Sequence, residues 1–172
     1  MDAYSLLLIA HLVGTVLGVG GATMIEVLLN KALADGNMSG DERGMLGWTF
    51  IVLRTGLVLS VLSGIGFILL YQLSGQEFRL QNPVFWAKMM MVLIVLINAL
   101  MLQAHKISLY WGSAFSFVTW WAIMVAGFFL TNGVRYGFFE IMIVYGVLVV
   151  AGAFVLHRVR EFIKSRTPQV AK

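Results

Sequence analysis

The sequence predicts an all-α integral membrane protein that forms a bundle of five transmembrane helices. Of its 172 residues, 60% are hydrophobic and 12% are charged, whereas a typical soluble domain is about 25% charged. The apolar residues form five long runs separated by shorter polar connections. Each run is long enough to cross a hydrocarbon core of about 30 Å. These two observations predict a single domain whose main partner is the lipid bilayer.

The five expected spans follow one another with little chain between them. The first begins directly after Met1 and Asp2 and is too long for the apolar core of a cleavable signal peptide. We expect the bundle to occupy residues 1–160 and a basic tail to occupy residues 161–172. The expected spans are 4–30, 46–73, 84–106, 111–132 and 138–160.

The first connection, residues 31–45, carries two local signals. Asp35-Gly36-Asn37 has the composition of a tight turn. Ser39 is followed three residues later by Glu42, which is the spacing of a capping box. We therefore expect a short surface helix to start at Ser39.

The later connections are also turns. Pro83 suits the first turn of the third helix. Only residues 107–110 separate the third and fourth spans, so these two helices are expected to form an antiparallel hairpin. The Thr-Asn-Gly sequence at 131–133 is another turn signal, between the fourth and fifth spans.

Lysine and arginine are distributed unequally between the two ends of the expected bundle. With five spans, connections 31–45 and 107–110 lie on the same side as the C-terminus. Because basic residues gather on the cytoplasmic side, we expect the N-terminus outside and the basic tail in the cytoplasm. The expected cytoplasmic set is Lys31, Arg43, Arg54, Lys106, Arg158, Arg160, Lys164, Arg166 and Lys172, and the opposite set is Arg79, Lys88 and Arg135.

The composition also excludes some functions. The net charge is only +4, and the basic residues lie at helix ends and in the tail, so we expect no nucleic-acid partner. The chain has no cysteine, which excludes disulfides, thiolate metal sites and cysteine nucleophiles.

His11 is the residue in the spans that most directly indicates chemistry. It lies early in the first span, and Gly14, Gly18 and Gly21 follow it on the same helical face. Such a stripe of small residues lets another helix, or a flat ligand, approach the backbone closely. Gly56, Ser60 and Gly64 repeat this spacing on the second span, where it predicts close packing on a neighbouring helix.

Other ionisable residues at membrane depth need partners. Glu26 and Arg54 are expected at similar depth on neighbouring helices, so we predict an ion pair that clamps these helices or lies on an ion path. Lys88, early in the third span, has three interpretations: it reaches the headgroups, pairs with Glu140, or faces the same pocket as His11 and binds a carboxylate there.

His11, the pair Gly20-Gly21, and Trp86-x-Lys88 at the start of the third span resemble a group of small haem-binding membrane proteins. The group comprises the bacterial protoporphyrinogen-oxidase type and the related copper-resistance-D-like membrane domains. The resemblance covers about the first 106 residues. It implies haem b as cofactor, His11 and Lys88 as the functional pair, and the bacterial cytoplasmic (inner) membrane as location.

The chemistry of His11 and the adjacent glycines is compatible with that resemblance. Histidine is a common axial ligand of haem iron, and Gly14 and Gly18 would leave room for a flat ring. The other histidines, His105 and His157, are expected near the opposite surface. The second axial position would therefore stay empty, or take Met124, Met142 or a residue of a partner chain.

Three functional hypotheses follow from these residues. The first is a haem b-binding protein, redox-active or not, with His11 as the metal ligand. The second is a non-catalytic subunit or assembly factor whose glycine stripes pack on a membrane partner or on a second copy of the chain. The third is a small transporter or channel that uses Glu26, Arg54 and Glu140.

Overall fold

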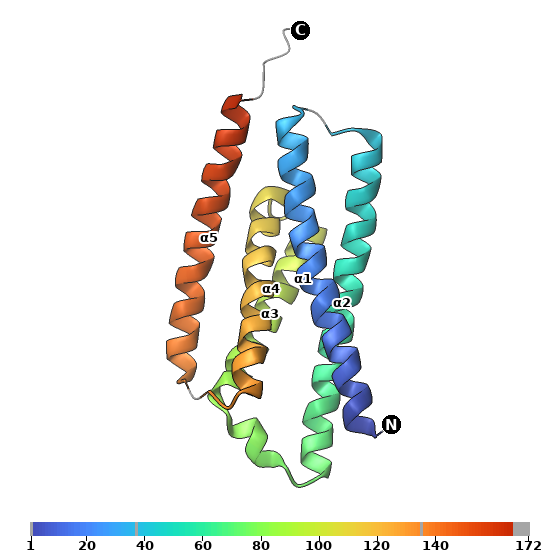
Figure 1. Ribbon diagram of the computed structural model, residues 1–172, viewed down its shortest axis with the longest axis vertical. Coiled ribbons are helices and arrows are strands. Elements are labelled where there is room, and N and C mark those ends of the chain that lie inside the picture. The colour runs from blue at the N-terminus through green and yellow to red at the C-terminus, as the bar shows by residue number, and fades with distance from the viewer. Residues whose placement is uncertain (1, 37, 135, 167–172) are drawn as a thin grey trace.

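The computed structural model describes residues 2–36, 38–134 and 136–166, and within these ranges every regular element is a helix. Five helices are long and apolar enough to cross a membrane, as predicted, which indicates a multi-pass membrane protein (Figure 1). They are α1 Ala3–Ala34, α2 Gly40–Leu73, α3 Pro83–Gln103, α4 Leu109–Thr131 and α5 Phe138–Arg166, with a short 3-10 helix, η1 Glu77–Gln81, before α3.

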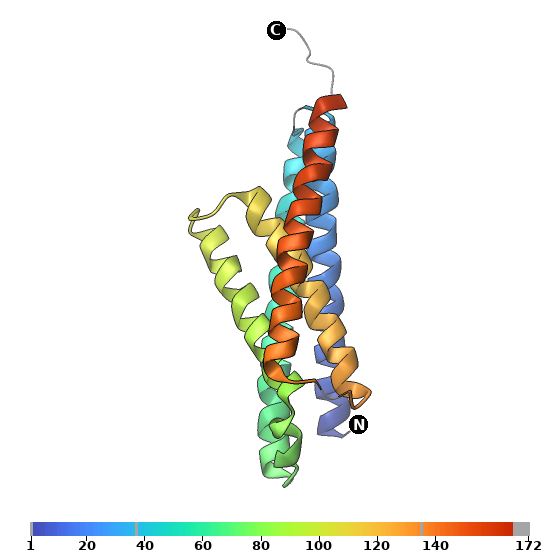
Figure 2. The ribbon, with the colours of Figure 1, turned by 90° about the vertical axis from the view of Figure 1, so that its left-hand side faces the viewer.

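The described helices alternate in direction along the long axis of the molecule. Figure 1 shows that α1 begins at one end and that α5 ends at the other. The end of α1, the start of α2 and the end of α5 therefore lie at the same end of the bundle. Figure 2 shows that α3 leans away from α1 and α2 toward its connection with α4. Consistently, α3 packs mainly on α4 and makes few backbone approaches to α1 or α2.

The predicted capping box is confirmed, but it starts a different helix from the one expected. The Glu42 amide donates to Ser39 Oγ at 3.2 Å, and the Ser39 amide donates to Glu42 Oε2 at 3.0 Å. This cap begins α2 itself at Gly40, so there is no separate surface helix and α2 starts before residue 46. The cap satisfies amide groups that would otherwise lack partners at the helix start.

The other predicted boundaries are set by local chemistry as well. Pro83 is the first residue of α3, and Asn82 caps the helix by accepting from the Val84 amide at 2.9 Å. α3 ends at Gln103 and not at 106, and His105 adopts a positive φ of 54°. Gly36 and Gly133 have φ values of 69° and 66°, a conformation that favours glycine in turns.

α5 is longer than predicted. It continues to Arg166, so the expected tail from 161 is corrected: its first six residues are helical. Phe162 and Ile163 extend the apolar pattern, and basic side chains in the last turn suit the negative end of the helix dipole. The remaining tail residues 167–172, together with Asn37 of the predicted turn and Arg135, lie outside the described residues.

The core is centred on α1 and α4. Most of α5 is exposed along its length, and its buried residues are Tyr145 and Arg160. Trp120 of α4 lies at the centre of the core with 2% of its surface exposed. The largest fully buried side chains are Trp120, Ile25, Leu29, Ile123, Val84, Val95 and Thr119.

The small-residue stripes of α1 and α2 pack against each other. A Cβ atom added to Gly56 would lie 2.6 Å from the backbone nitrogen of Gly18. A Cβ atom added to Gly14 would lie 2.7 Å from the backbone nitrogen of Ser60. These distances are too short for any side chain, so the glycines allow the two helix backbones to touch. The predicted helix contact is confirmed.

Candidate functional site: a buried histidine and lysine

The structure brings His11 and Lys88 together. His11 Nε2 lies 2.9 Å from Lys88 Nζ, and His11 Nδ1 lies 2.9 Å from Ser63 Oγ. The three side chains come from α1, α3 and α2. The edge of the His11 ring also contacts the ring of Phe67, with the two centroids 5.8 Å apart.

The hydrogen bonds of Ser63 assign the tautomer of His11. The Ser63 hydroxyl donates its one hydrogen to the backbone carbonyl of Leu59 at 2.6 Å. Its oxygen must therefore accept from His11, so Nδ1 of His11 carries a hydrogen. The remaining nitrogen, Nε2, then presents a lone pair to Lys88, which donates to it. His11 is thus a neutral imidazole whose Nε2 lone pair accepts from Lys88.

Lys88 is buried, and its side chain forms a hydrogen bond with His11. Its exposed fraction is 9%, and its Nζ lies 3.3 Å from the place where a Cβ of Gly127 would be. The absence of a side chain at Gly127 in α4 leaves room for the amine. Within residues 2–36, 38–134 and 136–166, Lys88 is in none of the ion pairs. The predicted pairing of Lys88 with Glu140 is wrong, because Lys88 contacts His11 instead.

Glu140 has a local role instead. It is exposed, and its Oε2 accepts from the Gly137 amide at 3.0 Å just before α5 begins. Glu140 therefore caps the start of α5 and is not the partner of Lys88.

The glycines predicted to line a cofactor site do not border open space. Gly14 touches the backbone of α2, and a Cβ on Gly18 would lie 2.3 Å from the ring of Trp120. A flat ligand therefore cannot lie on this face of α1, because α2 and Trp120 already occupy it. The prediction that Gly14 and Gly18 bind a cofactor is corrected: they are helix-packing positions.

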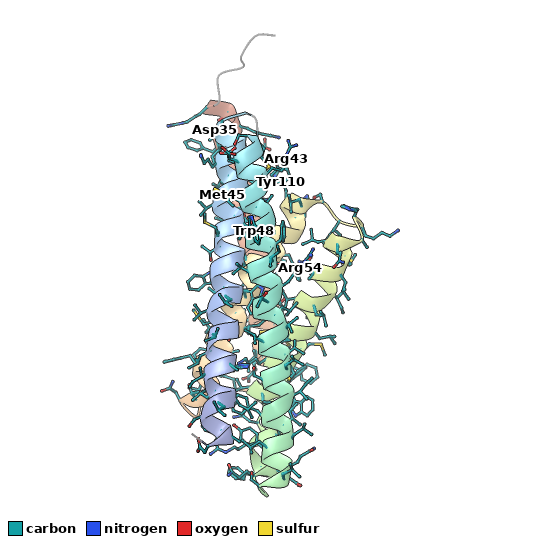
Figure 3. The ribbon with its side chains drawn as sticks, turned by 90° about the vertical axis from the view of Figure 1, so that its right-hand side faces the viewer. Asp35, Arg43, Met45, Trp48, Arg54 and Tyr110 are labelled. Carbon is teal, nitrogen blue, oxygen red and sulfur yellow. The ribbon has the colours of Figure 1, made fainter. Side chains whose placement is uncertain are left out.

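Glu26 is paired with Arg160 and not with Arg54. Arg160 Nη2 lies 2.6 Å from Glu26 Oε2, and Arg160 Nη1 donates to the carbonyl of Tyr110 at 2.7 Å. Glu26 and Arg160 are 4% and 8% exposed. The predicted partner Arg54 is wrong because Glu26 faces α4 and α5, whereas Arg54 projects from the side of α2 next to α3 (Figure 3).

This buried pair ties three helices together near one end of the bundle. Arg160 also lies over the ring of Tyr110, 5.3 Å from its centroid. Its Nη2 is 3.4 Å from Ser113 Oγ. The arginine therefore connects α5 to α1 and α4, which agrees with a structural clamp.

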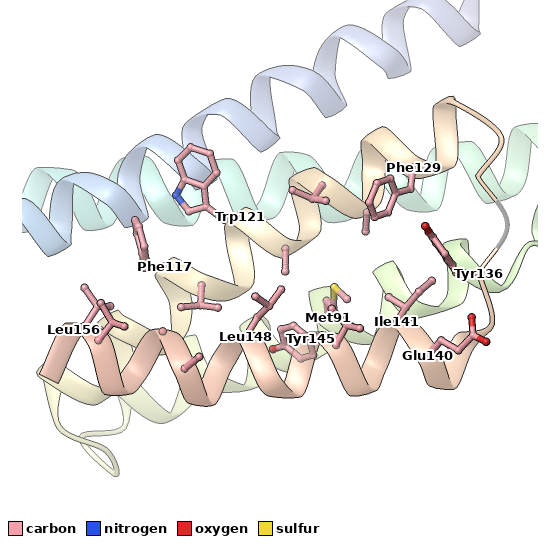
Figure 4. Close-up of a pocket in the computed structure, with 18 residues that line it drawn as sticks. Met91, Phe117, Trp121, Phe129, Tyr136, Glu140, Ile141, Tyr145, Leu148 and Leu156 are labelled. Atoms are coloured by element: carbon pink, nitrogen blue, oxygen red, sulfur yellow. The ribbon is translucent and has the colours of Figure 1, made fainter. Parts of the chain in front are cut away.

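Two cavities lie away from the histidine and lysine. The larger, of about 830 Å³, is an almost wholly apolar space between α4 and α5, with Glu140 and Tyr136 at one end (Figure 4). The smaller, of about 490 Å³, lies between α2, α3 and α4 and is lined in part by Arg54 and His105. Neither His11 nor Lys88 lines either cavity.

Sequence reasoning identified His11 and Lys88 but missed the residues that position them. Ser63 and Gly127 are ordinary membrane-helix residues, and only the rotation of each helix brings them to the site. The described ranges contain no cluster of three or more His, Asp or Glu side chains that could hold a metal ion.

The comparisons with known proteins found no relative. No family model matches the chain, and no curated protein or solved structure matches it significantly.

Proposed function

We propose that this protein binds haem b in the membrane, with His11 Nε2 as the axial ligand of the iron. The observation that carries the proposal is the assigned tautomer: Nδ1 donates to Ser63, and Nε2 presents a lone pair away from α2. Metal-ligating histidines are typically oriented by such a hydrogen bond from the other ring nitrogen. The resemblance carried by His11 and Lys88 points to the same cofactor.

The donors around His11 suit this cofactor, but the glycine stripe does not. Since Gly14 and Gly18 are packed against α2 and Trp120, the ring must be accommodated on the other side of His11. The side left for the ring is the one that faces α3, where Lys88 contacts His11. Because neither cavity reaches His11, binding would require α3 to move away from the α1–α2 pair. Cofactor sites in helical bundles are built between such facing helices.

Lys88 has a distinct role in this proposal. The lone pair of Nε2 serves one partner at a time, so Lys88 would have to give up its hydrogen bond to His11 for Nε2 to hold the iron. Its ammonium group would then be available to hold a propionate of the ring. Haem b, when bound, supplies one-electron redox chemistry.

The other two hypotheses have less support in the packing. The subunit hypothesis relied on glycine stripes that pack on a partner, and Gly14, Gly18 and Gly56 pack inside the chain. The transport hypothesis relied on Glu26 and Arg54, and Glu26 is held by Arg160.

We also propose that the protein lies in a bacterial cytoplasmic membrane with its N-terminus outside. The location is the one that the resemblance implies, and the orientation rests on the excess of basic residues at the end where α1 and α5 finish.

The visible absorption spectrum tests the haem proposal directly. We expect the full chain, expressed with added haem precursor and purified in mild detergent, to show a Soret band. His11→Ala should abolish or shift the band without unfolding the bundle, as judged by circular dichroism. A folded but colourless wild-type protein would falsify the proposal.

A further inference from the structure

The cavity between α2, α3 and α4 has a polar end and an apolar end. Arg54, Gln103 and His105 line it near the end of α3, whereas Leu57, Val95 and Trp120 line it closer to the middle of the bundle. Val95 is eight residues before Gln103, so the two ends are separated by about 12 Å along α3. None of the lining residues is acidic.

The polar end lies at the expected surface of the hydrocarbon core. α3 has 21 residues and is about 31 Å long, close to the thickness of the core. Gln103, its last residue, therefore marks one boundary. Arg54 lines the cavity together with Gln103, and the long side chain of an arginine near a membrane surface can extend its charge to the lipid headgroups.

Arg54 lacks a partner of opposite charge in the part of the chain that the structure describes. The ion pairs there use Lys31, Arg160 and Lys164 as the cations. Figure 3 shows Arg54 beside the gap between α2 and α3, and Arg43 on the same helix nearer its start. A guanidinium group at such a position gains most from a phosphate or carboxylate, which it binds through two parallel hydrogen bonds.

A second donor is available inside the cavity. Ser116 lines it and is 5% exposed. Its Oγ accepts from Asn98 Nδ2 at 2.8 Å, so its own hydroxyl hydrogen remains available to a ligand oxygen. Asn98 therefore holds the Ser116 hydroxyl at the cavity wall.

We propose that this cavity binds an anionic phospholipid of the surrounding bilayer, with its phosphate at Arg54 and one acyl chain along Leu57, Val95 and Trp120. The polarity of the cavity changes along the helix axis in the same direction as the polarity of a lipid. Its volume of about 490 Å³ is within the usual range for ligand sites. Because Arg54 has no acidic neighbour in the cavity, an anionic headgroup is favoured over a zwitterionic one. The proposal does not depend on haem binding.

Native mass spectrometry of the full chain in detergent measures this preference. We expect phosphatidylglycerol to bind more tightly than phosphatidylcholine with the same acyl chains. Arg54→Gln should weaken phosphatidylglycerol binding at least about fivefold, the effect of one basic residue near a membrane surface. Arg54→Lys should retain most of the preference because the charge remains. Arg43→Gln is the matched control and should leave the affinity unchanged.

A variant that fills the cavity distinguishes lipid binding inside the cavity from the attraction of anionic lipid to basic residues on the surface. Ala99 lines the cavity, and Ala99→Trp should reduce binding although Arg54 is intact. Equal affinity for the two lipids, or equal losses in Arg43→Gln and Arg54→Gln, would overturn the proposal. So would an Arg54→Gln variant that retains phosphatidylglycerol but loses haem, because the anion at Arg54 would then be a haem carboxylate.

Discussion

Lys88 Nζ lies 2.9 Å from His11 Nε2, although the two residues are 77 positions apart in the chain. Both are bases, and they share one hydrogen bond. Because Lys88 donates and a protonated His11 has no lone pair to accept, the contact requires His11 to be neutral. The geometry therefore keeps a basic imidazole nitrogen inside the bundle, occupied by Lys88.

Ser63→Ala should weaken the site by releasing His11. The Nδ1 hydrogen would lose its acceptor, and an unsatisfied buried donor costs about 1–3 kcal/mol of stability. Loss of an orienting hydrogen bond to a metal ligand typically costs about 10–100-fold in affinity, so haem retention should fall by a similar factor. Thermal melting in detergent and titration with haem measure the two effects.

Ser60→Ala is the matched control for Ser63→Ala. Ser60 is buried one turn away on α2, and its Oγ has no hydrogen-bond partner among the described residues. The substitution should leave haem retention unchanged and stability equal or slightly higher. Equal behaviour of the two variants would show that Ser63 does not orient His11.

Replacement of Lys88 should reduce haem retention more than it changes the stability of the haem-free protein. Lys88→Met removes a buried charge but also the donor to His11 Nε2, and these opposing effects should leave the stability of the haem-free protein close to that of wild type. Haem retention should fall, because no cation remains for a propionate, while the wavelength of the Soret band stays similar. Lys88→Arg should be milder. A Lys88→Met variant that binds haem like wild type would show that Lys88 is only a packing residue.

Glu26 and Arg160 should be strongly coupled. Glu26→Gln and Arg160→Gln each leave one buried charge without its partner, which costs about 3–5 kcal/mol of the free energy of unfolding. The double variant should cost less than the sum of the two single variants. Thermal or denaturant unfolding in detergent gives the coupling energy.

Arg54 supplies the control for this double-mutant cycle. Arg54→Gln combined with Glu26→Gln should be additive to within about 0.5 kcal/mol, as expected for residues that share no partner. A coupling of Glu26 with Arg54 as large as that with Arg160 would contradict the packing of α5 against α1.

The sequence was sufficient to predict the five spans, because the lipid bilayer strongly constrains which segments can cross it. A spanning helix must satisfy its backbone internally and present apolar side chains, so long apolar runs identify it. The cap at Ser39 and the start at Pro83 were also predictable, because each depends on residues within one turn. The predicted boundaries at the start of α2 and at the ends of α3 and α5 were wrong, because hydropathy marks the apolar run and a helix can end before it or continue past it.

Which side chains contact one another inside the bundle could not be predicted from hydropathy. Hydropathy gives the depth of Glu26 and Arg54, and their depths agree, but the rotation of each helix about its axis is set by packing. The contact of Gly14 and Gly18 with α2 and Trp120 fixes that rotation for α1. It directs Glu26 toward α5 and leaves His11 facing α3.

The topology proposal predicts a C-terminus in the cytoplasm. The basic residues Arg158, Arg160 and Lys164 near the end of α5 should keep that end inside. A fluorescent protein fused to the C-terminus should therefore be bright, and a phosphatase fused at the same place should be inactive. High phosphatase activity with a dark fluorescent fusion would reverse the assignment.

The contact between α1 and α2 should be sensitive to a single methyl group. A Cβ at Gly56 would lie 2.6 Å from the nitrogen of Gly18, which is backbone and cannot move aside, so Gly56→Ala should cost about 1–3 kcal/mol. Gly20 lies in α1 with no atom within 4 Å of an added Cβ, so Gly20→Ala should be neutral or gain up to about 1 kcal/mol. Unfolding in detergent measures the stability of both variants.

Because the contact also sets the rotation of α1, Gly56→Ala should reduce haem retention as well, whereas Gly20→Ala should not. Equal stability of the two variants would mean that the helices do not touch at Gly56.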